Sequence, residues 1–217
     1  MILCAGRGER MRPLTDTTPK PLLEVRGKAL IVWHLEKLCK AGFKEIVINI
    51  AHLGYKIPEY LGNGSRYGVQ ISYSDEQDTG ALESAGGIKK ALSLLGEEVF
   101  LVVNGDVFCT YTFDPSFDLK GKLAHLILVK NPEHNPNGDF GLNSTLVLNE
   151  AKQMYTFSGI GYYNPILFDS VGKTPLALAP LLREAIHNKS ISAEVYDGNW
   201  YDIGTPKRLE DINKAID

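Results

Sequence analysis

The sequence predicts an α/β fold: a single Rossmann-like domain with a mostly parallel central sheet and helices on both faces. Short apolar runs alternate with stretches of helical periodicity through the first half of the chain, which is the rhythm of β-α-β units. The run 99–104 (VFLVVN) is apolar almost throughout, as in parallel strands that are covered on both faces. The length of 217 residues suits one domain, because a single core can grow to about 250 residues.

Apolar runs and glycine breaks define the elements of the first half. We expect strands at 1–5, 45–50 (EIVINI), 69–73 and 99–104. Apolar residues between 30 and 39 recur at helical spacing and predict a helix that ends at Gly42. A second helix is expected over 84–95.

The second half is less regular. A strand is expected at 123–129, followed by strands at 140–148 and 153–163 with a turn at 149–150 between them. The run 175–186 is rich in Leu and Ala and predicts a helix. A final helix should begin with Thr205 as its N-cap and Pro206 at its first position, and should run toward Ile216.

Composition excludes several classes of protein. The chain has 23 basic and 26 acidic residues, whereas a surface that binds nucleic acid needs a basic excess. Three dispersed cysteines (Cys4, Cys39 and Cys109) form neither a disulfide framework nor a zinc-ligand pattern, which favours a reducing compartment. No apolar run reaches the ~18 residues of a membrane span, and no signal peptide is visible. We therefore expect a cytoplasmic protein with no nucleic-acid or membrane partner; its oligomeric state stays open.

The densest chemical signal follows the first strand, between residues 5 and 22 (AGRGERMRPLTDTTPKPL). Gly6 and Gly8 allow the backbone to approach a bulky anion, and Arg10 and Lys20 add the positive charge that a triphosphate needs. A dinucleotide fingerprint would need glycine where Met11 stands, and no G-K-[ST] follows to make a P-loop. Two glycines alone also fit a basic surface loop.

Two aspartates are candidate ligands of Mg²⁺. Asp106 follows the buried strand 99–104, and ligands of open α/β sheets bind beyond the carboxyl ends of the strands. Asp202 lies in Trp200-Tyr201-Asp202, just before the final helix. Carboxylates together with substrate phosphates are the usual ligands of Mg²⁺. The alternatives are a simple Asn-Gly-Asp turn for Asp106 and a favourable charge at a helix start for Asp202.

These motifs, G-x-G-x-R-M-x-P-L-T, P-K-P-L, N-G-D and W-x-D-I-G-T, resemble those of the sugar-1-phosphate nucleotidylyltransferase family. The stretches 82–88, 131–134, 138–140, 156–160 and 178–183 are most similar to the members that uridylylate N-acetylmuramic acid 1-phosphate in bacterial cell-wall recycling. The resemblance implies a nucleotidyltransferase domain over 1–217. The sequence contains no hexapeptide repeat, so we expect no C-terminal β-helix. It implies transfer of a uridylyl group from UTP to a sugar 1-phosphate, with Mg²⁺ as cofactor.

The resemblance also implies a role for particular residues. The catalytic set is Arg10, Lys20 and Asp106, and the metal ligands are Asp106 and Asp202. The nucleotide would be bound by Ala5, Gly6, Gly8, Lys20, Glu76, Ser84, Ala85 and Gly86. The sugar would be bound by Asn104, Gly138, Asp139, Ser158 and Gly159. One departure weakens the base assignment: Glu83 stands where many relatives carry glycine.

Alternatives remain open at this stage. Within the family, the chain could transfer a guanylyl or cytidylyl group to another phosphorylated sugar or to phosphocholine. A non-catalytic nucleotide-sugar sensor is a second alternative, although it would not need both aspartates together with Lys20 and Arg10. For the lactyl carboxylate of a muramyl substrate, the candidates are Arg183, Asn131 and His134, and His134 is otherwise interpreted as a plain loop residue.

Overall fold

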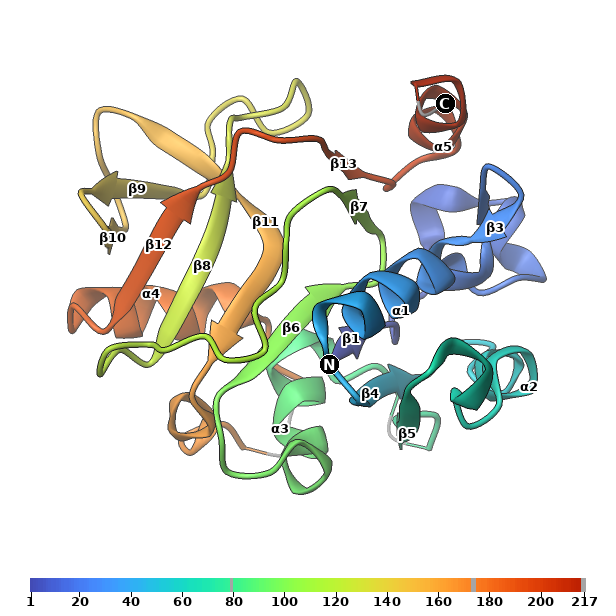
Figure 1. The fold of residues 1–217 in the computed structure, drawn as a ribbon. Coiled ribbons are helices and arrows are strands. Elements are labelled where there is room, and N and C mark those ends of the chain that lie inside the picture. Colours follow the sequence, from blue (N-terminus) through green and yellow to red (C-terminus); the bar gives the residue numbers. More distant parts are fainter. Residues whose placement is uncertain (79, 173–174, 216–217) are drawn as a thin grey trace.

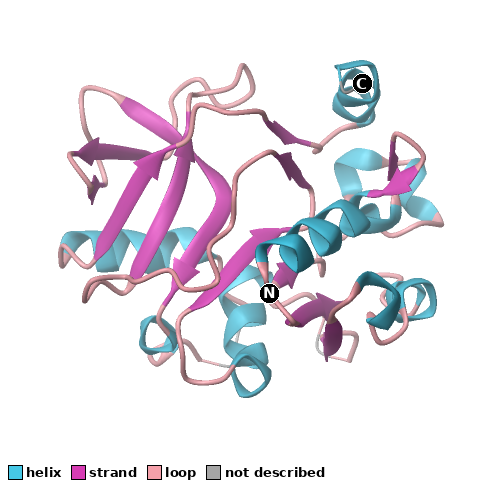
Figure 2. Cartoon of the chain, viewed as in Figure 1, coloured by secondary structure: helices cyan, strands magenta, loops and turns pink. Residues whose placement is uncertain are grey.

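The computed structural model describes residues 1–78, 80–172 and 175–215, and its strands form one large twisted sheet with helices on both sides (Figures 1 and 2). Within these residues, nine strands follow the order β5-β4-β1-β6-β11-β8-β12-β10-β9. Their bounds are β1 Ile2–Leu3, β4 Glu45–Ile50, β5 Gln70–Asp75, β6 Phe100–Asn104, β8 Ala124–Val129, β9 Phe140–Asn143, β10 Leu146–Leu148, β11 Met154–Tyr163 and β12 Ile191–Val195. The expected α/β class is confirmed.

The sheet is mixed: it combines parallel pairs, as predicted, with antiparallel ones. Strands β5, β4, β1 and β6 run parallel to one another, and β12 runs parallel to β8. The long strand β11 lies antiparallel between β6 and β8 and joins the two halves of the sheet. Its register against β8 shifts between Phe157 and Ile160, which is a β-bulge.

Helices cover both faces, because successive side chains of the central strands point to opposite sides. Leu101 and Val103 of β6 pack in one apolar cluster with helix α1 (Leu30–Ala41), whereas Phe100 and Val102 pack in another with α3 (Glu83–Leu95) and α4 (Leu178–His187). In Figure 1, α1 crosses in front of the sheet and α4 passes behind it. The shorter helices are α2 (Lys56–Leu61) and α5 (Pro206–Ala215).

Most predicted elements appear near their expected bounds. The strand 45–50 is found as predicted, and α1 ends where Gly42 adopts a left-handed φ of 105°. The final helix starts at Pro206, and Thr205 Oγ1 accepts a hydrogen bond from the Arg208 amide at 3.3 Å, so Thr205 is its N-cap. The helix is described to Ala215, and Ile216 lies outside the described residues.

Two expectations are wrong in detail. The segment 140–148 is a hairpin of two strands, β9 and β10, rather than one strand. At the turn of this hairpin, Ser144 adopts a φ of 55°. No glycine or proline stands there to mark the turn in the sequence. The first strand covers only residues 2–3, because the chain bends into the glycine loop from Cys4 onward.

Two short antiparallel pairs lie outside the main sheet. One pairs β2 (Glu24–Val25) with β3 (Lys28–Ala29), and the other pairs β7 (Val107–Cys109) with β13 (Trp200–Asp202). The second pair matters for the site, because β7 begins directly after Asp106 and β13 ends at Asp202. Within the described ranges, no helix is long and apolar enough to cross a membrane.

Candidate active site

A cavity of about 370 Å³ opens at the carboxyl ends of β1 and β6, where the topology of an open α/β sheet predicts a ligand. One wall comes from the chain after β1 and another from the turn before α3. The lining contains six residues of the sequence-based set: Ala5, Gly6, Lys20, Ser84, Asn104 and Asp106. Pieces of chain that are a hundred positions apart therefore meet in one cavity.

The glycine loop has a backbone that needs glycine at position 8. Gly8 adopts a left-handed φ of 64°, and a Cβ there would lie 2.9 Å from Thr15 Cγ2. The Gly8 carbonyl accepts hydrogen bonds from the Met11 amide and from Thr15 Oγ1, both at 2.8 Å, which closes a short 3₁₀ turn. Gly6 is exposed with open space at its Cβ position, so its backbone is accessible from the cavity. Arg10 is exposed on the same loop.

Lys20 and Asp106 form an ion pair inside this cavity. The two side chains approach to 2.5 Å between Nζ and Oδ2, and the Lys20 side chain is only 12% exposed. Pro19 and Pro21 flank the lysine and restrict its backbone. A largely buried ammonium and a carboxylate thus converge where the charge of phosphates and their counter-ion would gather.

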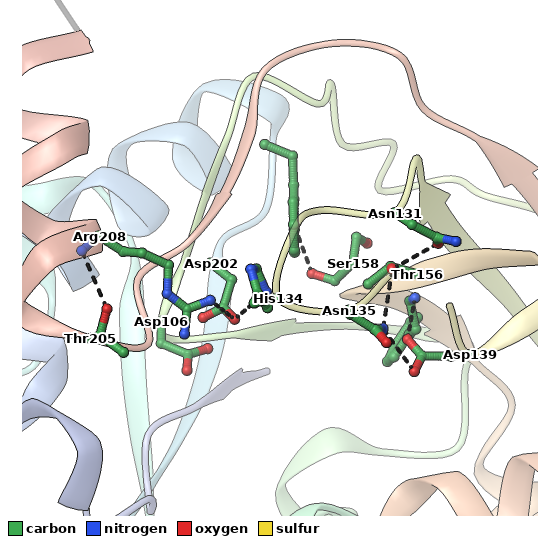
Figure 3. A network of polar contacts seen from close by, with 12 residues as sticks. Asp106, Asn131, His134, Asn135, Asp139, Thr156, Ser158, Asp202, Thr205 and Arg208 are labelled. Carbon is green, nitrogen blue, oxygen red and sulfur yellow. Dashed lines mark hydrogen bonds and ion pairs between the residues drawn. The ribbon is translucent and has the colours of Figure 1, made fainter. Parts of the chain in front are cut away.

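Asp202 lies beside Asp106, because β13 pairs with β7 in a register that sets Asp202 opposite Val107. The Ile203 amide also donates to the Asp106 carbonyl at 2.9 Å. The Asp202 carboxylate contacts two basic side chains: Arg208 Nη1 lies at 2.8 Å and His134 Nε2 at 3.1 Å from its Oδ2 (Figure 3). The fold therefore brings the two candidate metal ligands together across 96 positions of sequence.

On the nucleobase side, four of the expected residues, Glu76, Ser84, Ala85 and Gly86, make hydrogen bonds within the protein. Glu76 is fully buried, and its carboxylate accepts hydrogen bonds from Asn49 and from the Leu82 amide. The Ala85 and Gly86 amides donate to the Leu176 carbonyl at 2.9 and 3.2 Å. Ser84 lines the cavity, and its Oγ accepts from the Leu178 amide at 3.0 Å.

The backbone conformation of Glu83 shows what the exchange of glycine for glutamate at this position keeps and what it changes. It adopts a φ of 61°, the left-handed region in which glycine is unstrained. The position therefore keeps the backbone conformation that glycine would favour, and Glu83 lines the cavity. Compared with glycine, Glu83 adds a side chain with a carboxylate at this edge of the cavity.

On the sugar side, the expected residues surround the bulge in β11. Gly159 adopts a φ of 78°, and a Cβ there would lie 2.6 Å from Asn104 Nδ2. Ser158 is buried, and its Oγ donates to the Ile127 carbonyl at 2.7 Å and accepts from the Ile160 amide. Asp139 accepts from the Phe157 amide at 2.8 Å, and Gly138 adopts a φ of 67°. Ser158 and Asp139 thus hold the bulge and the loop 130–139 in place, while Asn104 faces the cavity.

Comparison with known proteins agrees with this geometry. The profile of the family described as nucleotidyl transferase matches residues 1–217. The chain belongs to this family. It is 52% identical, over 97% of its own length and 95% of the relative's, to a Neisseria meningitidis protein named N-acetylmuramate alpha-1-phosphate uridylyltransferase.

Other relatives are less similar, and some are longer than this chain. A Dictyostelium discoideum protein named mannose-1-phosphate guanylyltransferase catalytic subunit beta is 30% identical over 95% of this chain and 61% of its own length. Among solved structures, a candidate glucose-1-phosphate thymidylyltransferase from Bacillus anthracis superposes with a TM-score of 0.86 at 22% identity. That match covers 99% of this chain and 93% of the other, and it supports the fold.

Sequence reasoning missed Asn49 and Arg208 at this candidate site. His134 lies in a loop, as interpreted from the sequence, but it also has a partner that the sequence did not indicate. His134 contacts Asp202 across the site. Arg208 follows the N-cap Thr205 by three positions, a spacing that places it over the start of α5. Asn49 is polar within the apolar run 45–50 and lines the cavity, and this break in the pattern was the available signal.

Proposed function

We propose that this protein is a uridylyltransferase that joins the uridylyl group of UTP to N-acetylmuramate α-1-phosphate, giving UDP-N-acetylmuramate and pyrophosphate. The similarity to the Neisseria protein carries this proposal, because it extends over nearly the full length of both chains. The cavity at the sheet edge supports it, since its lining combines part of the glycine loop with Lys20 and Asp106, and the β7–β13 pair brings Asp202 next to that edge.

The reaction needs positioning and charge more than it needs a general base. A sugar-phosphate oxygen is already ionised at neutral pH and attacks the α-phosphorus of UTP; the new P–O bond forms as the bond to the β-phosphate oxygen breaks, and pyrophosphate leaves with that electron pair. Lys20, once drawn from Asp106 to the phosphates, offsets the repulsion between the two anions, and Arg10 on the glycine loop does the same from outside.

The two aspartates fit a resident Mg²⁺. Each carboxylate is held in the structure by basic side chains, Asp106 by Lys20 and Asp202 by Arg208 and His134, so the pair is ready to exchange these partners for a metal ion. Mg²⁺ in proteins is usually held by one or two carboxylates and takes its other ligands from substrate phosphates and water. When bound, Mg²⁺ neutralises phosphate charge and orients the triphosphate.

The positions of the remaining residues support the following assignments. We propose that Ala5, Gly6 and Gly8 contact the phosphates through their backbone, and that the turn with Glu83 and Ser84 faces the base. Ala85 and Gly86 contribute from the first turn of α3, where their amides donate to the Leu176 carbonyl. Asn104 contacts the sugar, while Gly138, Asp139, Ser158 and Gly159 shape its wall. One nucleotidyltransferase domain spans 1–217 and works in the cytoplasm, where UTP is made.

A matrix of substrates tests the proposal. UTP, GTP, CTP and dTTP are each combined with N-acetylmuramate, N-acetylglucosamine, glucose and mannose 1-phosphates, and pyrophosphate release is measured with and without Mg²⁺. The expected result is the highest kcat/KM for UTP with N-acetylmuramate 1-phosphate. Highest activity with GTP and mannose 1-phosphate would instead place the chain with its guanylyltransferase relatives, and no pyrophosphate release from any pair would overturn catalysis altogether.

A further inference from the structure

A chain of buried hydrogen bonds links the two walls of the nucleotide cavity. The Cys4 amide, directly after β1, donates to Asn49 Oδ1 at 2.8 Å. Asn49 Nδ2 donates to Glu76 Oε1 at 2.8 Å, and Glu76 Oε2 accepts from the Leu82 amide at 2.8 Å. Asn49 is 2% exposed and Glu76 is 0% exposed. These contacts, called the Asn49–Glu76 relay below, connect the strand that enters the glycine loop with the turn that starts α3.

The relay depends on which group donates and which accepts. An amide at position 49 can accept from the Cys4 amide and donate to Glu76 at the same time, whereas a carboxylate can only accept. A buried donor or acceptor without its partner costs far more than an average hydrogen bond contributes. The pattern therefore fixes the separation between Cys4 and Leu82 through two rigid, desolvated side chains.

Helix α3 packs directly over the relay. At Gly87, a Cβ would lie 2.7 Å from Glu76 Oε1 and 2.9 Å from Asn49 Nδ2. Both contacts are shorter than any ordinary Cβ contact, so glycine is required here although the residue sits inside a helix. The relay therefore has no room to rearrange while α3 stays in place.

The two linked segments are the walls of the candidate nucleotide site. Cys4, Ala5 and Gly6 line it on one side, and Ala81, Glu83 and Ser84 line it on the other. We propose that Asn49 and Glu76 are positioning residues that set the width of this cavity and so determine its affinity for the nucleoside triphosphate. The inference rests on the proposed function only in taking this cavity as the nucleotide site.

Exchanging the two functional groups gives a sharp test. In Asn49→Asp, two carboxylates face each other. In Glu76→Gln, the amide nitrogen faces either Asn49 Nδ2 or the Leu82 amide, and in both orientations two donors meet. In the double variant Asn49→Asp/Glu76→Gln, the new carboxylate at position 49 accepts from the Cys4 amide and from the new amide at position 76. The oxygen of that amide accepts from Leu82, so the three hydrogen bonds of the relay return, with the direction of the one between positions 49 and 76 reversed.

We expect each single variant to raise the UTP KM about tenfold or more, since it leaves buried polar groups unpaired. The double variant should recover most of that loss, because its two changes compensate each other within one hydrogen-bonded pair. If the effects of the two single variants on the UTP KM were independent, the double variant would show no such recovery.

The readouts separate positioning from general damage. The KM for the sugar 1-phosphate and the thermal midpoint are measured beside the UTP KM, and UTP affinity is measured directly by calorimetry. Glu45→Gln, which removes an exposed carboxylate from the first position of the same strand β4, is the matched control and should change none of these values. If wild type turns out to use another triphosphate, the proposed function fails, and the same variants are tested with that triphosphate.

Three results would overturn the relay: single variants with an unchanged KM for the triphosphate, a double variant as impaired as the sum of the singles, or an equal loss for both substrates. Should the variants of Asn49 and Glu76 fail to fold, the variant Gly87→Ala tests the relay instead. This change favours helix formation but drives a methyl group into the relay, so it should keep α3 and raise the UTP KM selectively. A Gly87→Ala protein with wild-type affinity for UTP would contradict the proposal.

Discussion

At the scale of single residues, the site is organised by charge pairs that stand where substrate and metal would bind. Lys20 pairs with Asp106, and Arg208 and His134 pair with Asp202. Half-buried pairs of this kind need no external counter-ion, because each charge already has a partner of opposite sign. Substrate binding must then replace these contacts, which makes the aspartates sensitive positions for function but less so for folding.

The first prediction concerns Asp106. Asp106→Asn should lower kcat by about a hundredfold or more at saturating Mg²⁺, because it removes one of the two proposed anionic ligands and the ion-pair partner of Lys20. The thermal midpoint should change little, since the carboxylate is about a third exposed. Asp169→Asn, an exposed aspartate beyond β11, is the control and should keep full activity. A near-normal kcat for Asp106→Asn would remove Asp106 from the metal site.

At the scale of elements, the sequence predicted what periodicity and glycine could show. The strand 45–50 and helix α1 were correctly placed, because an apolar run and a C-terminal glycine mark them. The hairpin 140–148 was missed because Ser144 makes its turn without glycine or proline. Nor could periodicity reveal that β11 runs antiparallel between parallel strands, since pairing depends on residues far apart in the sequence.

The same limit applied to the site. Gly6, Gly8 and Lys20 belong to one continuous motif and could be found directly. The proximity of Asp106 to Asp202 depends on the pairing of β7 with β13, which only the folded chain reveals. Glu76 was expected near the nucleobase, yet its side chain is fully buried behind the cavity wall. A sequence pattern can mark a residue as part of a site. Only the packing of the folded chain shows whether its side chain lines the cavity or holds the cavity wall from behind.

The packing of α1 against β7 makes stability depend on pH through His34. This side chain is 3% exposed, and burial, aided by the nearby charge of Lys37, lowers its pKa from 6.5 to about 4. Between these values the unfolded chain binds a proton that the folded chain does not, so the free energy of unfolding decreases as the pH falls from about 6.5 toward 4. The His34 contribution lost by pH 5 should be about 2 kcal/mol.

Urea unfolding at pH 7 and pH 5 measures this contribution. His34→Gln, which cannot titrate, should show a smaller loss of stability between the two pH values than wild type. His187→Gln removes an exposed histidine from the end of α4 and should leave the wild-type pH dependence intact. An identical pH dependence for wild type and His34→Gln would show that His34 does not titrate in this way.

At the scale of the whole molecule, the two halves of the sheet border different parts of the candidate site. The strands β4, β1 and β6 contribute to the candidate nucleotide cavity, whereas β8, β9 and β11 carry the bulge and loop of the candidate sugar side. Asp106 and Asp202 lie at the junction, held by the β7–β13 pair. Nucleotide preference and sugar preference should therefore be separable by mutation, because different elements determine them.

The sugar side offers an available cation for the lactyl carboxylate that distinguishes muramyl from glucosaminyl substrates. Of the three candidates from the sequence, Asn131 is engaged through both amide atoms with Thr156, Pro136 and Met154, and His134 contacts Asp202. Arg183 on α4 is exposed, lies over the Phe140 ring and makes one long hydrogen bond, 3.3 Å, to the Asp139 carbonyl. Its guanidinium can therefore turn to a carboxylate without leaving a buried group unpaired.

Arg183→Gln should accordingly raise the KM for N-acetylmuramate 1-phosphate about tenfold, the cost of one charge-assisted contact, while the KM for N-acetylglucosamine 1-phosphate and for UTP stay unchanged. Lys207→Gln, which removes an exposed cation from α5, is the matched control for net charge. Steady-state kinetics at a fixed UTP concentration measure the KM for each of the two sugar phosphates, and the ratio of the two KM values is compared between wild type and variant. An equal rise for both sugars would mean that Arg183 stabilises the loop through Asp139 instead of binding the lactyl group, because a loop displaced from the bulge would disturb every sugar that the site accepts.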